Sequence, residues 1–157
     1  MLLGACPHGK KAVADLTDST VVLDAGLRKA LLEVVRRCVP DIDAIYLFGS
    51  VARGRTRPGS DVDVALLLPP GRKLSPDELL ATMAELESLT HKTVDLSVLN
   101  TQTQLVHAKE VVTTGVCLFA RSQERIRAFE MQVLSEYARF LEDRAPVEAA
   151  YTFDTHG

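Results

Sequence analysis

The feature that most constrains the fold is the alternation of two kinds of apolar segment along the chain. Short, densely apolar runs occupy residues 42–48, 61–68, 93–99 and 116–120, and their length and composition are typical of buried β-strands. Longer segments with apolar residues every three or four positions predict amphipathic helices at 24–38, from 75 onward, at 101–114 and at 122–143. This order predicts an α/β or α+β domain in which helices cover at least one face of a sheet.

Individual residues mark several ends of these predicted helices. Pro40 closes the first one, and Gly115 follows the one at 101–114. Ser75 can cap the helix that begins there, Pro76 suits its first position, and Glu78 completes a capping box. These signals indicate that the helices are encoded locally as well as by their apolar faces.

The length of the chain, 157 residues, suits a single domain. Residues 1–22 mix Gly, Pro, Lys and Asp without a steady period, which predicts a leader outside the fold. We expect the folded domain at 23–145 and a flexible tail at 146–157, where Pro146 interrupts the pattern.

Charge and cysteine content narrow the functional classes. The net charge of -3 and the pI of about 5.8 argue against broad electrostatic binding to nucleic acid or membranes, and no run approaches the roughly 18 apolar residues of a membrane span. Of the three cysteines, Cys38 and Cys117 fall on apolar faces, where small buried side chains are the expected role. We therefore expect a cytoplasmic protein that contacts neither nucleic acid nor membrane directly.

The segment that carries chemistry begins with Gly49-Ser50 at the end of the first predicted strand. A glycine at this place lets the backbone turn tightly and approach a ligand closely. Ser50 begins a predicted helical turn at 50–54, whose free backbone N–H groups and hydroxyl can meet phosphate oxygens. Alone, this pair is typical of many strand-ending turns.

Three aspartates follow. Asp61 and Asp63 are two residues apart on a predicted strand, so their carboxylates point to the same face. Asp95 lies inside the apolar run 93–99, where a carboxylate is costly unless it is paired or binds a metal. If the two strands are neighbours, the three form one cluster, whose oxygen ligands suit Mg²⁺ and its bound phosphates. A solvated strand edge is the alternative for Asp61 and Asp63 taken alone.

This pattern of residues resembles the polymerase-β-like nucleotidyltransferase superfamily: Gly49-Ser50, then Asp61-x-Asp63, and Asp95 on a later strand. That resemblance implies a small mixed sheet flanked by helices. It also implies that Gly49 and Ser50 contact the phosphates of ATP and that the three aspartates hold Mg²⁺ and serve catalysis, with Asp95 helping to deprotonate the acceptor hydroxyl. Arg53, which follows the Gly-Ser pair, would steady a phosphate.

A narrower resemblance is to the minimal nucleotidyltransferase (MNT) antitoxins. It rests on the short chain and on the stretch from Val94-Asp95-Leu96 to Asn100, which is followed by a predicted helix, Gly115 and a short strand. The resemblance implies a complex with a HEPN-domain ribonuclease toxin, in which AMP is transferred from ATP to a toxin tyrosine. Two alternatives stay open: an antitoxin that neutralises by binding alone, and transfer to a small molecule. His107, in a predicted helix, is expected to be structural, and the apolar face of the last helix fits either core packing or a partner.

Overall fold

The computed structural model describes residues 25–54, 59–99 and 104–153, and it contains a four-stranded mixed sheet. The strands are β1 (Ala44–Phe48), β2 (Val62–Leu67), β3 (Val94–Val98) and β4 (Val116–Ala120), in the spatial order β3-β2-β1-β4. β1 runs antiparallel to both β2 and β4, whereas β2 and β3 are parallel. The predicted mixed sheet is confirmed, and each strand lies within the run predicted for it. The predicted leader lies outside the described residues.

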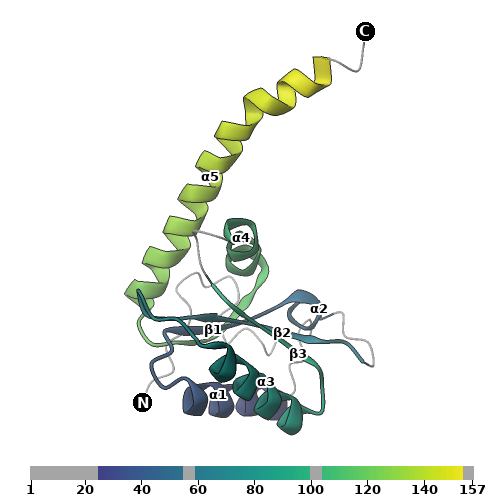
Figure 1. Cartoon of the computed structure of the whole chain (residues 1–157), viewed down its shortest axis with the longest axis vertical. Coiled ribbons are helices and arrows are strands. Elements are labelled where there is room, and N and C mark those ends of the chain that lie inside the picture. Colours follow the sequence, from purple (N-terminus) through teal and green to yellow (C-terminus); the bar gives the residue numbers. More distant parts are fainter. Residues whose placement is uncertain (1–24, 55–58, 100–103, 154–157) are drawn as a thin grey trace.

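Helices cover both faces of the sheet, as Figure 1 shows. α1 (Ala25–Cys38) and α3 (Pro76–Thr90) pack side by side on one face, over alternate residues of the strands such as Leu47 and Val64. α4 (Leu105–Thr114) and α5 (Gln123–Phe153) cover the other face, over residues such as Tyr46 and Ala65. Because side chains alternate along a strand, each strand contributes to two apolar cores.

The capping box predicted at the start of α3 is present. The Ser75 hydroxyl accepts a hydrogen bond from the Glu78 amide at 3.1 Å, and the Glu78 carboxylate accepts one from the Ser75 amide at 2.8 Å. Pro76 occupies the first helical position. Local sequence therefore sets this helix start independently of packing.

A buried hydrogen bond fixes α5 to the sheet. The Tyr46 hydroxyl on β1 donates to the Glu130 carboxylate at 3.0 Å, and both side chains are buried. Burial, together with the Glu130 charge, raises the pKa of Tyr46 far above its usual value. Tyr46 is therefore a neutral donor at any physiological pH.

The last helix departs from the prediction. α5 ends at Phe153, with Pro146 inside it, so the expected end at Asp143 was wrong. Proline removes one helical hydrogen bond, but Ala145, Ala149 and Ala150 flank it, and alanine is the strongest helix former. The distal part of α5 projects away from the sheet (Figure 1). No helix in the described ranges combines the length and the apolar character that crossing a membrane requires.

Candidate active site

Strand pairing brings two of the predicted carboxylates together. In the parallel register of β2 and β3, Asp63 is the direct partner of Asp95. Asp61 precedes β2 by one residue and is exposed, whereas Asp63 is half-buried. The strand adjacency that the three-aspartate cluster requires is therefore present, and both strands are anchored by buried neighbours such as Val62 and Val94.

Gly49 lets the chain pass close to this carboxylate pair. It begins α2 (Gly49–Ala52) directly after β1, with a φ of +73°, which L-residues rarely adopt. A Cβ added at Gly49 would lie 2.1 Å from Oδ2 of Asp63. The absence of a side chain at Gly49 thus leaves room for the Asp63 side chain, and Ser50 follows Gly49 in the first turn of α2.

The charges around Asp63 disfavour its ionised form. Burial raises the pKa of Asp63, the nearby Asp95 and Asp61 raise it further, and His107 counteracts this in part. Carboxylates held together in this way are suited to a divalent cation, which offsets their repulsion.

The protein supplies only some of the oxygen ligands that Mg²⁺ needs. No group of three or more His, Cys, Asp or Glu side chains within the described ranges is arranged as a metal-binding cluster. Mg²⁺ is usually held by one or two carboxylates together with substrate phosphates. The neighbouring pair Asp63 and Asp95 supplies such carboxylates, and the remaining ligands would come from the nucleotide.

Helix α4 adds two residues that the sequence analysis did not assign to the site. Nε2 of His107 lies 3.0 Å from Oγ of Ser97, which is two residues beyond Asp95 on β3. The His107 ring also meets the edge of Phe48, with centroids 5.1 Å apart, and Phe48 is the register partner of Asp63. His107 was expected to be structural, and these contacts are structural, but they hold it beside the carboxylates.

Glu110, the second of these residues, binds Arg53. The Arg53 guanidinium donates to the Glu110 carboxylate at 3.0 Å, and both side chains are about half exposed, at 47% and 51%. His107 and Glu110 are three residues apart on one helix and therefore share a face. That spacing is the sequence signal that would have grouped them. Arg53, expected to steady a phosphate, is paired with an internal anion here.

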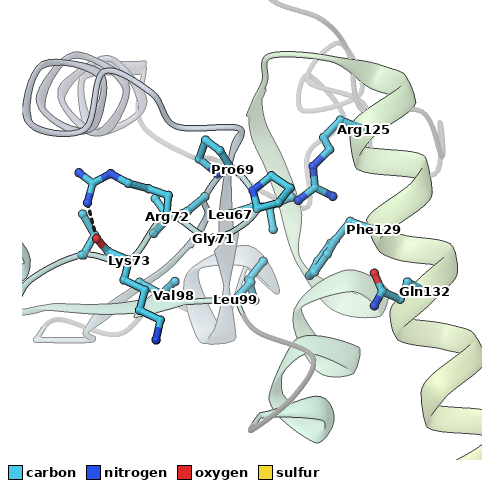
Figure 2. A pocket seen from close by; sticks show the side chains of 13 residues that line it. Leu67, Pro69, Gly71, Arg72, Lys73, Val98, Leu99, Arg125, Phe129 and Gln132 are labelled. Atoms are coloured by element: carbon cyan, nitrogen blue, oxygen red, sulfur yellow. Dashed lines mark hydrogen bonds between the residues drawn. The ribbon is translucent and has the colours of Figure 1, made fainter.

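A pocket of about 660 Å³ lies elsewhere on the same face of the sheet, at the carboxyl ends of β2 and β3 (Figure 2). Leu67 and Leu99 line it from the sheet side, and Arg125 and Phe129 line it from α5. No acidic residue is among its lining residues, so it lacks the groups needed to hold a metal-bound triphosphate. This pocket and the carboxylate pair are therefore separate features.

Comparison with known families defines the class of the protein. Residues 30–124 match the model of the polymerase beta nucleotidyltransferase family, a span of more than half of the 157 residues. The chain belongs to this family and is a nucleotidyltransferase. The polymerase-β-like fold predicted from Gly49-Ser50 and the aspartates is confirmed. No curated protein sequence matches the chain.

Chains of solved toxin–antitoxin structures have a similar fold. A chain of a toxin–antitoxin crystal structure with AMP-PNP is 26% identical, with a TM-score of 0.70 over 80% of this chain and 98% of that chain. A chain of the tri-AMPylated Shewanella oneidensis HEPN toxin in complex with MNT antitoxin is 24% identical, with a TM-score of 0.65 over 80% and 96%. A chain of an MntA-HepT toxin–antitoxin structure is 24% identical, with a TM-score of 0.64 over 80% and 97%. The expected resemblance to MNT antitoxins is confirmed.

Proposed function

We propose that the protein transfers AMP from ATP to a tyrosine of a HEPN ribonuclease toxin and so acts as its antitoxin. The observation that carries this proposal is the pairing of Asp63 with Asp95 beside the Gly49 turn. Carboxylates on adjacent strands, next to a backbone turn free of side chains, are suited to a metal-bound triphosphate. The complex of a similar protein with AMP-PNP and the AMPylated HEPN toxin in another support the choice of nucleotide and acceptor.

Each residue then has a role in the transfer. Gly49 and Ser50 would contact the phosphates, and Asp61, Asp63 and Asp95 would hold Mg²⁺. Asp95 would also accept the proton of the acceptor hydroxyl. The hydroxyl oxygen forms a bond to the α-phosphorus, the bond from that phosphorus to the β-phosphate bridge breaks, and pyrophosphate leaves. The bound Mg²⁺ supplies positive charge that offsets the charge developing on the phosphates.

Arg53 has to exchange partners in this scheme. It is bound to Glu110 in the structure, and a triphosphate competes for the same guanidinium. Half-exposed ion pairs of this kind are worth at most ~1 kcal/mol, so a nucleotide phosphate, which carries more charge, displaces Glu110 readily. We therefore assign Arg53 to phosphate contact in the nucleotide-bound state.

The test is transfer of the α-phosphate label of ATP to the cognate HEPN toxin in the presence of Mg²⁺, followed by mass spectrometry of both proteins. We expect a mass gain of one or more AMP units on the toxin, and its loss in Asp63→Asn and Asp95→Asn. Asp77→Asn is the matched control because Asp77 is an exposed carboxylate in the first turn of α3, on the opposite face of the sheet. AMP transfer at the wild-type level by both site variants would refute the proposal.

Two further outcomes of this experiment would favour a different function. If the complex forms and the toxin is silenced without any mass gain, the protein neutralises by binding alone. If label passes to an added small hydroxyl compound and not to the toxin, the acceptor is a small molecule. A cytoplasmic location, expected from the cysteines, stays a prediction that fractionation of cells would test.

A further inference from the structure

Asp95 lies on the less supported of the two strands that carry the carboxylate pair. In the described sheet β2 is hydrogen-bonded to both β1 and β3, whereas β3 is at the edge and pairs with β2 alone. An element that is held on one side opens locally at a lower free energy than one held on both. The position of Asp95 beside Asp63 therefore depends on what holds β3 to the rest of the domain.

The Ser97 hydroxyl connects β3 with helix α4. Ser97 is two residues beyond Asp95 on β3, and it lies on the same face of the sheet because side chains alternate along a strand. Its Oγ lies 3.0 Å from Nε2 of His107 and 3.5 Å from the carbonyl oxygen of Val64, the residue after Asp63. The hydroxyl thus joins the edge strand to α4 and to β2 close to both carboxylates.

The His107 ring spans the strand that carries Asp63. It contacts Ser97 on β3 and packs at 73° to the Phe48 ring on β1, with centroids 5.1 Å apart. Since β2 lies between these two strands and Phe48 is the register partner of Asp63, the imidazole lies over β2 next to Asp63. The pKa of Asp63 is consistent with this position, because burial and the acidic neighbours raise it and His107 opposes them in part.

Helix α4 is itself held in place and can act as a fixed support. Ala108 and Val111 are fully buried in the core on this face of the sheet, and Glu110 is paired with Arg53, the C-cap of α2. These contacts begin directly after His107 along the helix. The imidazole is therefore carried by an element whose position is set by packing, as a precisely placed site requires.

We propose that His107 is a positioning residue for the pair of carboxylates. Through the Ser97 hydroxyl it holds the edge strand β3, and through the Phe48 ring it is fixed on β1. The placement of Asp95 relative to Asp63, and with it the fit of both to a metal-bound nucleotide, is thereby set from α4. The assignment of these two aspartates to Mg²⁺ rests on the proposed function.

The experiment compares the full-length wild type with His107→Phe, which keeps a ring against Phe48 but loses the ring nitrogen, and with Ser97→Ala, which loses the hydroxyl. Mn²⁺ serves as a paramagnetic probe of the Mg²⁺ site, and its Kd for the protein is measured by EPR titration with excess AMP-PNP. Transfer of label from ATP to the cognate HEPN toxin gives kcat and the KM for the toxin. Each variant is expected to raise the Mn²⁺ Kd and to lower kcat about tenfold, with the KM for the toxin unchanged.

Three further variants separate positioning from a general loss of stability. The double variant His107→Phe/Ser97→Ala should be no more impaired than either single variant, because both changes remove the same hydrogen bond. His107→Gln should restore most of the wild-type kcat, since its amide can bond to the Ser97 hydroxyl as Nε2 does. The control, Thr82→Val, removes the buried hydroxyl that donates to the Glu78 carbonyl on α3, on the other face of the sheet. It should lower the melting temperature and leave the Mn²⁺ Kd and kcat unchanged.

Wild-type Mn²⁺ affinity and kcat in both single variants overturn the proposal. So does an additive loss in the double variant, because the two side chains would then act through separate contacts. An equal loss of kcat in Thr82→Val overturns it as well, since lower stability alone would explain the effect.

Failure of the proposed function gives a different result. A wild type that binds Mn²⁺ with AMP-PNP but transfers no AMP to the toxin refutes the proposed acceptor, and the Mn²⁺ comparison still decides the role of His107. A wild type that binds no Mn²⁺ with AMP-PNP overturns both.

Discussion

Replacing Gly49 by alanine tests the geometry of the site most directly. The added Cβ would lie 2.1 Å from Oδ2 of Asp63, whereas van der Waals contact between carbon and oxygen requires more than ~3 Å. The carboxylate therefore has to move by about 1 Å, and a displacement of that size at a reacting centre can lower a rate ~100-fold. The φ of +73° adds strain, which costs about 1–2 kcal/mol of folding free energy for a residue with a Cβ.

We therefore expect Gly49→Ala to lose about 99% of AMP transfer while losing only about 1–2 kcal/mol of stability. Label transfer from ATP measures the first quantity, and urea denaturation measures the second. Gly71→Ala is the matched control because Gly71 has a φ of +79° and no atom within 4 Å of its added Cβ. It should show the same loss of stability with full transfer.

The reasoning is refuted if Gly49→Ala transfers AMP at the wild-type rate. It is refuted equally if Gly71→Ala loses as much transfer as Gly49→Ala. In that case backbone strain alone, and not the displacement of Asp63, would account for the loss.

Three further perturbations follow from the contacts described. The pKa of Asp63 is raised by burial and by its acidic neighbours, so the unliganded protein loses stability as the pH rises through that pKa. Asp63→Asn should therefore melt at a higher temperature than the wild type at pH 7. Scanning calorimetry should find no such gain below the usual aspartate pKa of about 3.9. Glu110→Gln removes the carboxylate bound to Arg53. Titration with AMP-PNP and Mg²⁺ should then show nucleotide binding that is about two- to fivefold tighter. Unchanged or weaker nucleotide binding would contradict the competition between Glu110 and phosphate for Arg53. Tyr46→Phe removes the donor to the buried Glu130 carboxylate. It should lower the free energy of unfolding, measured by urea denaturation, by about 1–3 kcal/mol and leave the nucleotide affinity unchanged. A loss below about 0.5 kcal/mol would show that the Glu130 carboxylate does not need this hydrogen bond.

Much of the secondary structure was predictable because its signals are local. The apolar runs predicted the four strands, and the Ser75-Pro76 pair with Glu78 predicted the start of α3. The end of α5 was missed because Pro146 is a strong stop signal in sequence, although the helix accommodates it in the structure. The free-energy cost of one proline is offset by the helix-forming residues around it. The sum over the whole segment therefore decides where the helix ends, and the proline alone does not show it.

The strands and the turn that carry the proposed site residues were predictable, but the contacts among those residues were not. Gly49 was expected to permit a close approach to a ligand, which stays a prediction, and only the structure shows that the Asp63 carboxylate also lies against this glycine. Glu110 was missed altogether, because a charged residue in a helix usually faces solvent. Its role depends on where α4 lies relative to α2, and no short-range signal reports that distance.

The sequence by itself determined the order of strands and helices, the Gly49-Ser50 turn and the membership of a nucleotidyltransferase family, because period, turn chemistry and motif spacing are properties of short segments. The tertiary structure decided that β2 and β3 pair in parallel with Asp63 opposite Asp95, that α4 brings His107 beside them, and that the side of α5 is left uncovered. These features depend on which distant segments meet. Strand order and helix placement are fixed by burying the apolar faces of all elements together, so they emerge only from the folded whole.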